Sequence, residues 1–188
     1  KKLIYVINKV DIIIFNVALV GGVLFNLKSN TTLESHINSL LDFINILKTN
    51  KNSQKNLKFI FISSASVYPP YKKNIKYSEN MGDILLPDKS NFMYAMSKRV
   101  MESICKSLSH YKNINYLILR PFNLYGYYDN FDEKTGHVIP SLIKKFENFI
   151  SHNKPIKILG DLKSSRNFVF ISDVANIIIL LAQHNKCK

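Results

Sequence analysis

The sequence predicts an α/β fold in which a parallel β-sheet is covered by helices. Short, almost continuous runs of apolar residues alternate within residues 1–120 with longer segments whose apolar residues recur at helical spacing. Continuous apolar runs are typical of strands that are buried on both faces, as parallel strands are. The resulting order of strand, helix, strand, helix and strand is that of parallel strands joined by helical crossovers.

The first predicted strand is the apolar run from Asp11 to Phe15. It is followed by Val20-Gly21-Gly22, a sequence typical of a loop. Thr31 and Glu34 then form a capping box, which indicates that a helix begins there. The apolar residues of this helix recur at helical spacing, at Ile37, Leu40, Leu41, Ile44 and Leu47.

A second buried strand is predicted from Phe59 to Ser63. Ser64-Ala65-Ser66 follows at its carboxyl end, where parallel sheets bind their ligands, so we expect chemistry there. A third strand, from Tyr116 to Leu119, is closed by Pro121. The helix predicted between these two strands has an apolar stripe that consists of Met93, Met96, Val100, Ile104 and Leu108.

The pattern changes after Pro121. An aromatic and polar loop leads to a predicted helix from about Val138 to Ile150, and two short strands follow, at Ile156–Leu159 and Phe168–Ile171. Ser172 is expected to cap the last helix. The sequence therefore predicts a second structural region after the parallel sheet.

Composition narrows the class of protein. The formal net charge is +13, but the lysines are spread along the chain. A solvated surface is the first interpretation of this charge, attraction of an anionic nucleotide ligand the second, and nucleic-acid binding a distant third. We expect no membrane span, because the apolar stretch from Ile12 to Phe25 is interrupted by Asn16 and is shorter than the roughly 20 residues required. Two distant cysteines, Cys105 and Cys187, favour a reducing, cytoplasmic setting.

Tyr94 and Lys98 are candidates for catalysis. Because they are four positions apart on a predicted helix, their side chains lie on the same face. A phenol has a pKa of about 10, and a neighbouring ammonium group favours the ionised form, so we expect Lys98 to lower the pKa of Tyr94. The hydroxyl of Ser64 could hydrogen-bond a substrate carbonyl beside Tyr94. The alternative interpretation is an exposed helix face in a chain rich in tyrosine and lysine.

Three motifs follow one another in the chain: Ser64, Tyr94-Ala95-Met96-Ser97-Lys98 and Arg120-Pro121-Phe122-Asn123-Leu124-Tyr125-Gly126. Together they resemble the extended short-chain dehydrogenases/reductases of the NAD-dependent epimerase/dehydratase type, over nearly the whole chain. The resemblance implies a Rossmann-like parallel sheet with flanking helices and part of a smaller substrate-binding domain. It also implies that Tyr94 is the acid/base, that Lys98 lowers its pKa and holds the nicotinamide ribose, and that Ser64 orients the reacting carbonyl.

The same resemblance implies an NADPH site between two segments of the chain. His137 and Lys98 would contribute to it from elsewhere. The two segments are Ile62, Ser63, Ser64 and Ala65 after the second strand, and Pro121, Phe122, Asn123 and Leu124 after the third.

Further stretches, Val20-Gly21-Gly22, Asp129-Asn130-Phe131 and Gly136-His137-Val138-Ile139-Pro140, are similar to those of the GDP-L-fucose synthases within that family. This implies an NADPH-dependent 3,5-epimerase/4-reductase that acts on GDP-4-keto-6-deoxy-D-mannose, in a cytoplasmic homodimer. His137 would be the acid in epimerisation. Ser66 stands at the position of the cysteine base. Alcohols do not ionise near neutral pH, whereas thiols have a pKa of about 8.5. If Ser66 cannot replace the cysteine, we expect reduction without epimerisation.

Three residues match substrate-binding positions of the family. Arg166 matches an arginine that grips the substrate diphosphate, for which a guanidinium group is well suited. Lys145 and Leu159 match two more, although relatives often carry tryptophan in place of Leu159. Without the resemblance, Arg166 would be a surface residue at the start of a strand and His137 a polar residue near a helix start. No metal site is predicted.

No G-x-x-G-x-x-G turn occurs in the sequence, although the family holds the cofactor pyrophosphate on such a turn. The chain also begins with Lys1. We therefore expect a fragment that lacks its N-terminal βαβ units, with a partial NAD(P)-binding domain at residues 1–120 and a partial substrate-binding region at residues 121–188. Competing functions are another nucleotide-sugar epimerase, dehydratase or reductase, a non-catalytic relative that keeps the fold, and a nucleic-acid binder.

Overall fold

The three strands predicted in the first part of the chain form one parallel sheet. β1 (Ile12–Phe15), β2 (Lys58–Ile62) and β3 (Asn115–Leu119) lie in the order β1-β2-β3, so β2 is central. Ile60 of β2 is aligned with Ile14 of β1. The fold class and the strand order along the chain are thus confirmed. The computed structural model describes residues 9–17, 31–49, 57–72, 74–112, 114–158 and 165–184.

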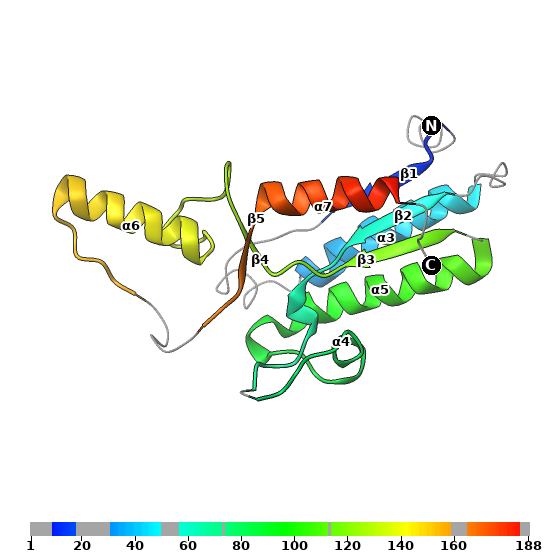
Figure 1. The fold of residues 1–188 in the computed structure, drawn as a ribbon, viewed down its shortest axis with the longest axis horizontal. Coiled ribbons are helices and arrows are strands. Elements are labelled where there is room, and N and C mark those ends of the chain that lie inside the picture. The colour runs from blue at the N-terminus through cyan, green and yellow to red at the C-terminus, as the bar shows by residue number, and fades with distance from the viewer. Residues whose placement is uncertain are drawn as a thin grey trace.

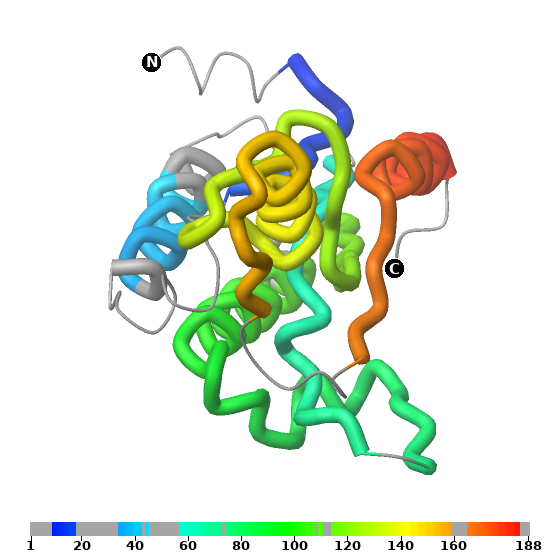
Figure 2. The backbone as a smooth tube through the Cα atoms, turned by 90° about the vertical axis from the view of Figure 1, so that its left-hand side faces the viewer, coloured from blue at the N-terminus to red at the C-terminus, as the bar shows by residue number. Residues whose placement is uncertain are grey.

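Helices cover both faces of this sheet. α3 (Thr31–Thr49) and α5 (Phe92–Lys112) are the predicted crossovers and lie side by side on one face, whereas α7 (Ile171–Gln183) lies on the opposite side (Figures 1 and 2). A core forms between the sheet and the two crossover helices, because their apolar side chains are withdrawn from water together. Its buried members include Phe15, Leu40, Ile44, Phe59, Phe61, Met101 and Cys105.

The apolar stripe predicted for α5 is wrong in part. Met93 and Val100 are each 36% exposed. The residues of α5 that are buried instead are Ala95, Ser97, Lys98, Met101, Glu102 and Cys105. A hydrophobicity pattern assigns Lys98 and Glu102 to the surface, but both are buried, where Lys98 bonds the carbonyl of Ile62 and Glu102 bonds Arg120.

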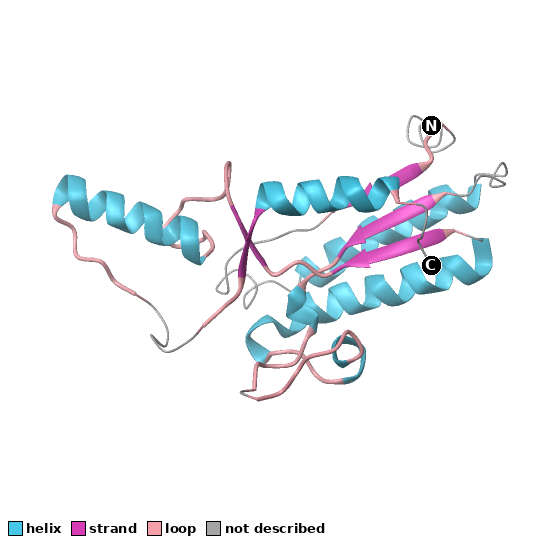
Figure 3. Ribbon diagram, in the orientation of Figure 1, coloured by secondary structure: helices cyan, strands magenta, loops and turns pink. Residues whose placement is uncertain are grey.

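The loop between β2 and α5 contains three short helical turns that the sequence analysis did not predict. They are η1 (Ala65–Val67), α4 (Met81–Ile84) and η2 (Lys89–Asn91). Figure 3 shows this loop and the arrowheads of β2 and β3 at the same end of the sheet. The carboxyl ends of the strands therefore open toward the loop.

The region after residue 120 contains β4 (Asn123–Tyr125), α6 (Val138–His152) and β5 (Phe168–Phe170). β4 and β5 form a separate two-stranded parallel sheet, and α6 lies apart from the main sheet (Figure 1). β5 was predicted, whereas β4 was not. The strand predicted at residues 156–159 is wrong in its described part, since residues 156–158 form no regular structure.

Val20-Gly21-Gly22, Leu159 and the side chain of Thr31 lie outside the described residues. α7 begins one residue before the predicted cap, and its carboxyl end is tied to the main sheet, because Lys58 Nζ donates to the carbonyl oxygen of Ala182 at 2.8 Å. None of the helices in the described part of the chain is long and apolar enough to cross a membrane.

Candidate active site

Ser64, Tyr94 and Lys98 meet at the carboxyl end of β2. Ser64 is the second residue after this strand and caps η1, and Tyr94 and Lys98 come from the first two turns of α5. Because β2 and β3 are parallel, the chain must return from the carboxyl end of β2 to the amino end of β3. α5 makes this crossover, so its first residues lie near the carboxyl end of β2. The predicted set of three is therefore assembled in the structure.

The hydroxyl of Ser64 bonds to three groups. Ser64 Oγ accepts a hydrogen bond from the backbone N–H of Ser66 and donates one to Ser66 Oγ, both at 3.1 Å. It also hydrogen-bonds the phenol of Tyr94, which lowers the pKa of that phenol. Ser66, which stands at the position of the expected base, is thus hydrogen-bonded to Ser64, the residue expected to orient the carbonyl.

Lys98 is a buried cation. The residue is only 2% exposed, and its Nζ donates to the carbonyl oxygen of Ile62 at 3.0 Å. Nζ lies 5.8 Å from the centre of the Tyr94 ring and 5.2 Å from that of Phe61. Burial lowers the pKa of Lys98 to about 8, while the negative charge of Glu102 raises it.

The pKa of Tyr94 is raised above its ordinary value, contrary to the prediction. Burial of the phenol is the larger cause, and the hydrogen bond with Ser64 opposes it. The ammonium group of Lys98 is directed to the carbonyl of Ile62, so it does not outweigh the loss of solvation. At neutral pH the phenol therefore keeps its proton, which suits a proton donor.

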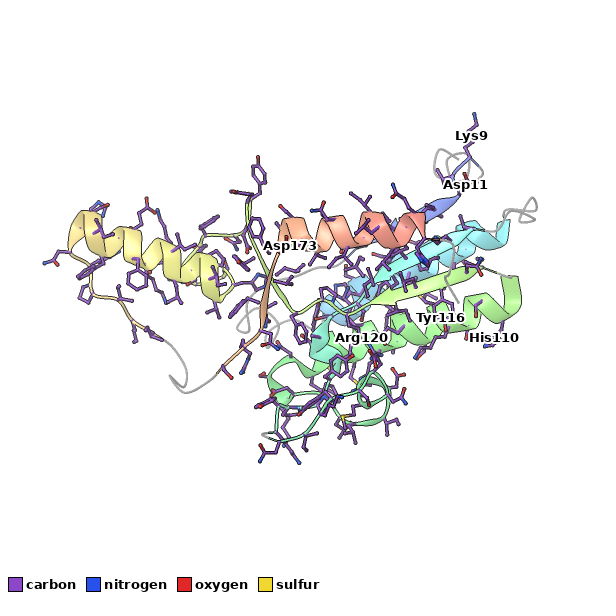
Figure 4. The ribbon with its side chains drawn as sticks, viewed as in Figure 1. Lys9, Asp11, His110, Tyr116, Arg120 and Asp173 are labelled. Atoms are coloured by element: carbon purple, nitrogen blue, oxygen red, sulfur yellow. The ribbon has the colours of Figure 1, made fainter. Side chains whose placement is uncertain are left out.

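An ion-pair network of Glu102, Arg120 and Asp83, which the sequence analysis did not predict, adjoins the site. Glu102 accepts bonds from Arg120 Nε at 3.0 Å and from Arg120 Nη2 at 2.6 Å, and the hydroxyl of Ser63 also donates to it. Arg120 Nη2 reaches Asp83 of α4 at 2.6 Å as well, and the guanidinium lies 5.2 Å from the centre of the Tyr68 ring. Arg120 is labelled in Figure 4, at the end of β3 beside the loop that carries α4. The spacing of Glu102 four residues after Lys98 was the signal that could have revealed the network.

The two segments predicted to line a cofactor adjoin each other. Ser63 N donates to the carbonyl of Leu119 at 2.7 Å, and Ala65 N donates to that of Pro121 at 2.9 Å. Beyond them, Phe122 is exposed and Asn123 Nδ2 donates to the carbonyl of Asn167. Leu124 pairs with Val169 across β4 and β5.

His137 is not brought into this cluster. It is exposed at the start of α6, and its Nδ1 lies 3.7 Å from Asp129 Oδ1. Within the described part of the chain, no hydrogen bond, ion pair or ring contact joins His137 to Ser64, Tyr94 or Lys98.

The predicted substrate-binding cations lie on the surface. Lys145 Nζ donates to the carbonyl of Lys157 at 2.9 Å, and Arg166 Nη1 donates to that of Ser165 at 2.8 Å. Asp88 caps the turn before α5, and hydrogen bonds from Ser90 lower the pKa of its carboxyl, which the charge of Arg166 lowers further. Of the two, Arg166 is therefore the one whose charge reaches the turn before α5.

The sequence model of the NAD dependent epimerase/dehydratase family matches residues 2–188. The chain is 29% identical over 171 residues to the GDP-L-fucose synthase of Escherichia coli (strain K12), covering 89% of this chain and 51% of that protein. It is also 29% identical over 176 residues to the GDP-L-colitose synthase of Yersinia pseudotuberculosis, covering 91% and 55%.

A solved GDP-L-fucose synthetase from Naegleria fowleri, bound to NADP, shares the fold. Its TM-score is 0.73 at 23% identity, and the match covers 94% of this chain and 57% of that one. The chain thus spans about half the length of the curated relatives it matches.

Proposed function

The chain belongs to the NAD dependent epimerase/dehydratase family, and we propose that it carries the catalytic residues of an NADPH-dependent reductase of a GDP-linked 4-keto-6-deoxyhexose. The carrying observation is that Ser64, Tyr94 and Lys98 meet at the carboxyl end of β2, where parallel sheets bind ligands. The similarity to a GDP-L-fucose synthase and a GDP-L-colitose synthase supports a GDP-sugar substrate.

The surroundings of Lys98 fit a nicotinamide nucleotide. Among the described residues, the carbonyl of Ile62 is the hydrogen-bond acceptor of this buried ammonium group, so two of its three N–H groups remain for a ligand. Buried donors are normally paired, and ribose hydroxyls are acceptors of the right kind. When bound, the cofactor supplies a hydride for the sugar carbonyl.

Tyr94 acts as the proton donor in this proposal. Its phenol gives a proton to the carbonyl oxygen of the substrate, and Ser64 holds that oxygen by a hydrogen bond. The phenolate left on Tyr94 is stabilised by the positive charge of Lys98, whose pKa of about 8 leaves it mostly protonated at neutral pH. Burial keeps the resting phenol protonated, and Lys98 opposes the cost of forming its phenolate during proton transfer.

Ser66 separates reduction from epimerisation. Its hydroxyl is engaged by Ser64, and an alcohol is not ionised at neutral pH, so it is a poor base for removing a carbon-bound proton. His137, the expected epimerisation acid, lies on another element without a described contact to the cluster. We infer a 4-reductase without 3,5-epimerase activity.

The test is product analysis with GDP-4-keto-6-deoxy-D-mannose and NADPH in D₂O. We expect a reduced 6-deoxyhexose with no solvent deuterium at C3 or C5, and deuterium incorporation in the Ser66→Cys variant. Tyr94→Phe should slow reduction by about 100-fold or more, the usual contribution of a general acid. Deuterium incorporation by the parent protein at the rate of reduction contradicts the inferred loss of epimerisation. Unchanged turnover in Tyr94→Phe contradicts the assignment of Tyr94 as the acid, and an absence of turnover in the parent protein favours a non-catalytic relative.

A further inference from the structure

A histidine of α3 contacts the candidate acid from the other crossover helix. His36 is 0% exposed and faces α5. Its Nδ1 lies 2.9 Å from Ser97 Oγ, and the hydroxyl of Ser97 donates to the carbonyl oxygen of Tyr94 at 2.7 Å. Two hydrogen bonds thus join His36 to the backbone of Tyr94.

The direction of these bonds follows from their chemistry. A serine hydroxyl has one proton, and in Ser97 this proton is given to the carbonyl of Tyr94. The remaining bond can form only if Ser97 Oγ accepts, so Nδ1 of His36 carries a proton and donates it. The imidazole is a donor here, and an alanine or a phenylalanine could not replace it in this bond.

The same ring also touches the side chain of Tyr94. The ring centres are 5.8 Å apart, with an angle of 69° between the planes, which is an edge-to-face contact. Tyr94 is thereby held at two points by His36, while Ser64 and Lys98 contact its phenol and its ring from the end of β2 and from α5. A ring fixed from several sides has less freedom to leave the position from which it transfers a proton.

We propose that His36 is a positioning residue, which fixes Tyr94 for proton transfer through Ser97 and through direct ring contact. This proposal rests on the proposed function in one respect, which is that Tyr94 is the acid. It assigns a role in the reaction to α3, a helix without any of the three catalytic candidates.

Three variants separate the hydrogen bond of His36 to Ser97 from its ring contact with Tyr94, and a fourth is a control. His36→Phe keeps a ring but cannot donate to Ser97, and Ser97→Ala removes the hydroxyl that connects His36 to Tyr94. His36→Asn carries an N–H group at the same distance from the backbone as Nδ1, so it can restore the bond to Ser97 without the ring. Asn38→Ala, on the exposed side of α3, is the matched control.

We expect kcat to fall about tenfold or more in His36→Phe and in Ser97→Ala, with KM within about twofold of the parent value, because positioning affects the chemical step. His36→Asn should recover most of kcat, and Asn38→Ala should match the parent. Values of kcat within about twofold of the parent in both His36→Phe and Ser97→Ala overturn the proposal. Since Ser97→Ala removes one oxygen atom, it provides the test if His36→Phe does not fold.

A second measurement is independent of turnover. The ¹³Cζ resonance of Tyr94, assigned by its absence in Tyr94→Phe, should shift in His36→Phe and Ser97→Ala and stay in place in Asn38→Ala. A shift without turnover of any nucleotide sugar supports the contact and rejects the proposed function. An unchanged resonance in both variants rejects the positioning role, whatever the activity.

Discussion

The buried pair of Glu102 and Arg120 offers a sharp test of how the site is held together. Glu102 is 1% exposed and is bonded by Arg120 through two N–H groups, at 2.6 and 3.0 Å. Arg120→Met leaves this carboxylate buried, with the hydroxyl of Ser63 as its remaining donor in the described network. Removing one member of a buried ion pair lowers the free energy of unfolding by about 3–5 kcal/mol. We expect about 4 kcal/mol, measured by urea unfolding followed by circular dichroism.

A second substitution, at Glu102, tests whether the unpaired buried charge causes this loss of stability. Adding Glu102→Leu removes the unpaired charge, so the double variant should regain at least half of the lost stability. Lys106→Met, which breaks an exposed pair with the 41% exposed Asp83, is the control and should change stability by less than about 1 kcal/mol. A loss below about 1 kcal/mol in Arg120→Met, or a double variant less stable than the single one, would refute the assigned role of the pair.

Three further outcomes follow from the same geometry. Gly82→Ala places a Cβ atom 2.6 Å from Arg120 Nη1, so it should lower the free energy of unfolding by about 1–3 kcal/mol in the same urea assay. The pKa of Lys98 is about 8 when folded and 10.5 ordinarily, so between these pH values the unfolded chain binds more protons and stability rises with pH. Relative to Lys98→Met, the parent should gain up to about 3 kcal/mol across this window in urea titrations, at about 1.4 kcal/mol per pKa unit. Burial raises the pKa of Cys105 to about 12, so a maleimide should label this thiol only after unfolding, as mass spectrometry would show.

The sequence predicts the main sheet and the meeting of the catalytic candidates. β1, β2 and β3 contain the predicted apolar runs, and helical crossovers force their carboxyl ends to one edge. β2 is buried as predicted, whereas Ile12 and Ile14 of β1 are exposed. Ser64 is the second residue after β2, and Tyr94 lies in the first turn of the next long helix. Local pattern and topology together therefore suffice to bring these two residues to the same place.

Other parts of the site depend on contacts that no local pattern contains. The buried face of α5 was missed because Lys98 and Glu102 are charged, and their burial depends on Ile62 and Arg120. β4 was missed because three residues, Asn123–Tyr125, become a strand only by pairing with a segment far along the chain. The role of His36 likewise depends on a partner on another helix.

The opposite pKa shifts of Tyr94 and Lys98 bear on the direction of the proposed reaction. Burial favours the neutral phenol and disfavours the ammonium group, yet Glu102, one helical turn beyond Lys98, favours the charge. At neutral pH the resulting state is a protonated phenol beside a cation. That state is ready to give a proton to a carbonyl oxygen and to stabilise the phenolate that remains, whereas oxidation of an alcohol needs the phenolate first. The raised pKa of Tyr94 thus suits the proton donor of a reduction, and the charge of Glu102 raises the pKa of Lys98 that burial lowers, so that a cation lies beside the phenolate formed by proton transfer.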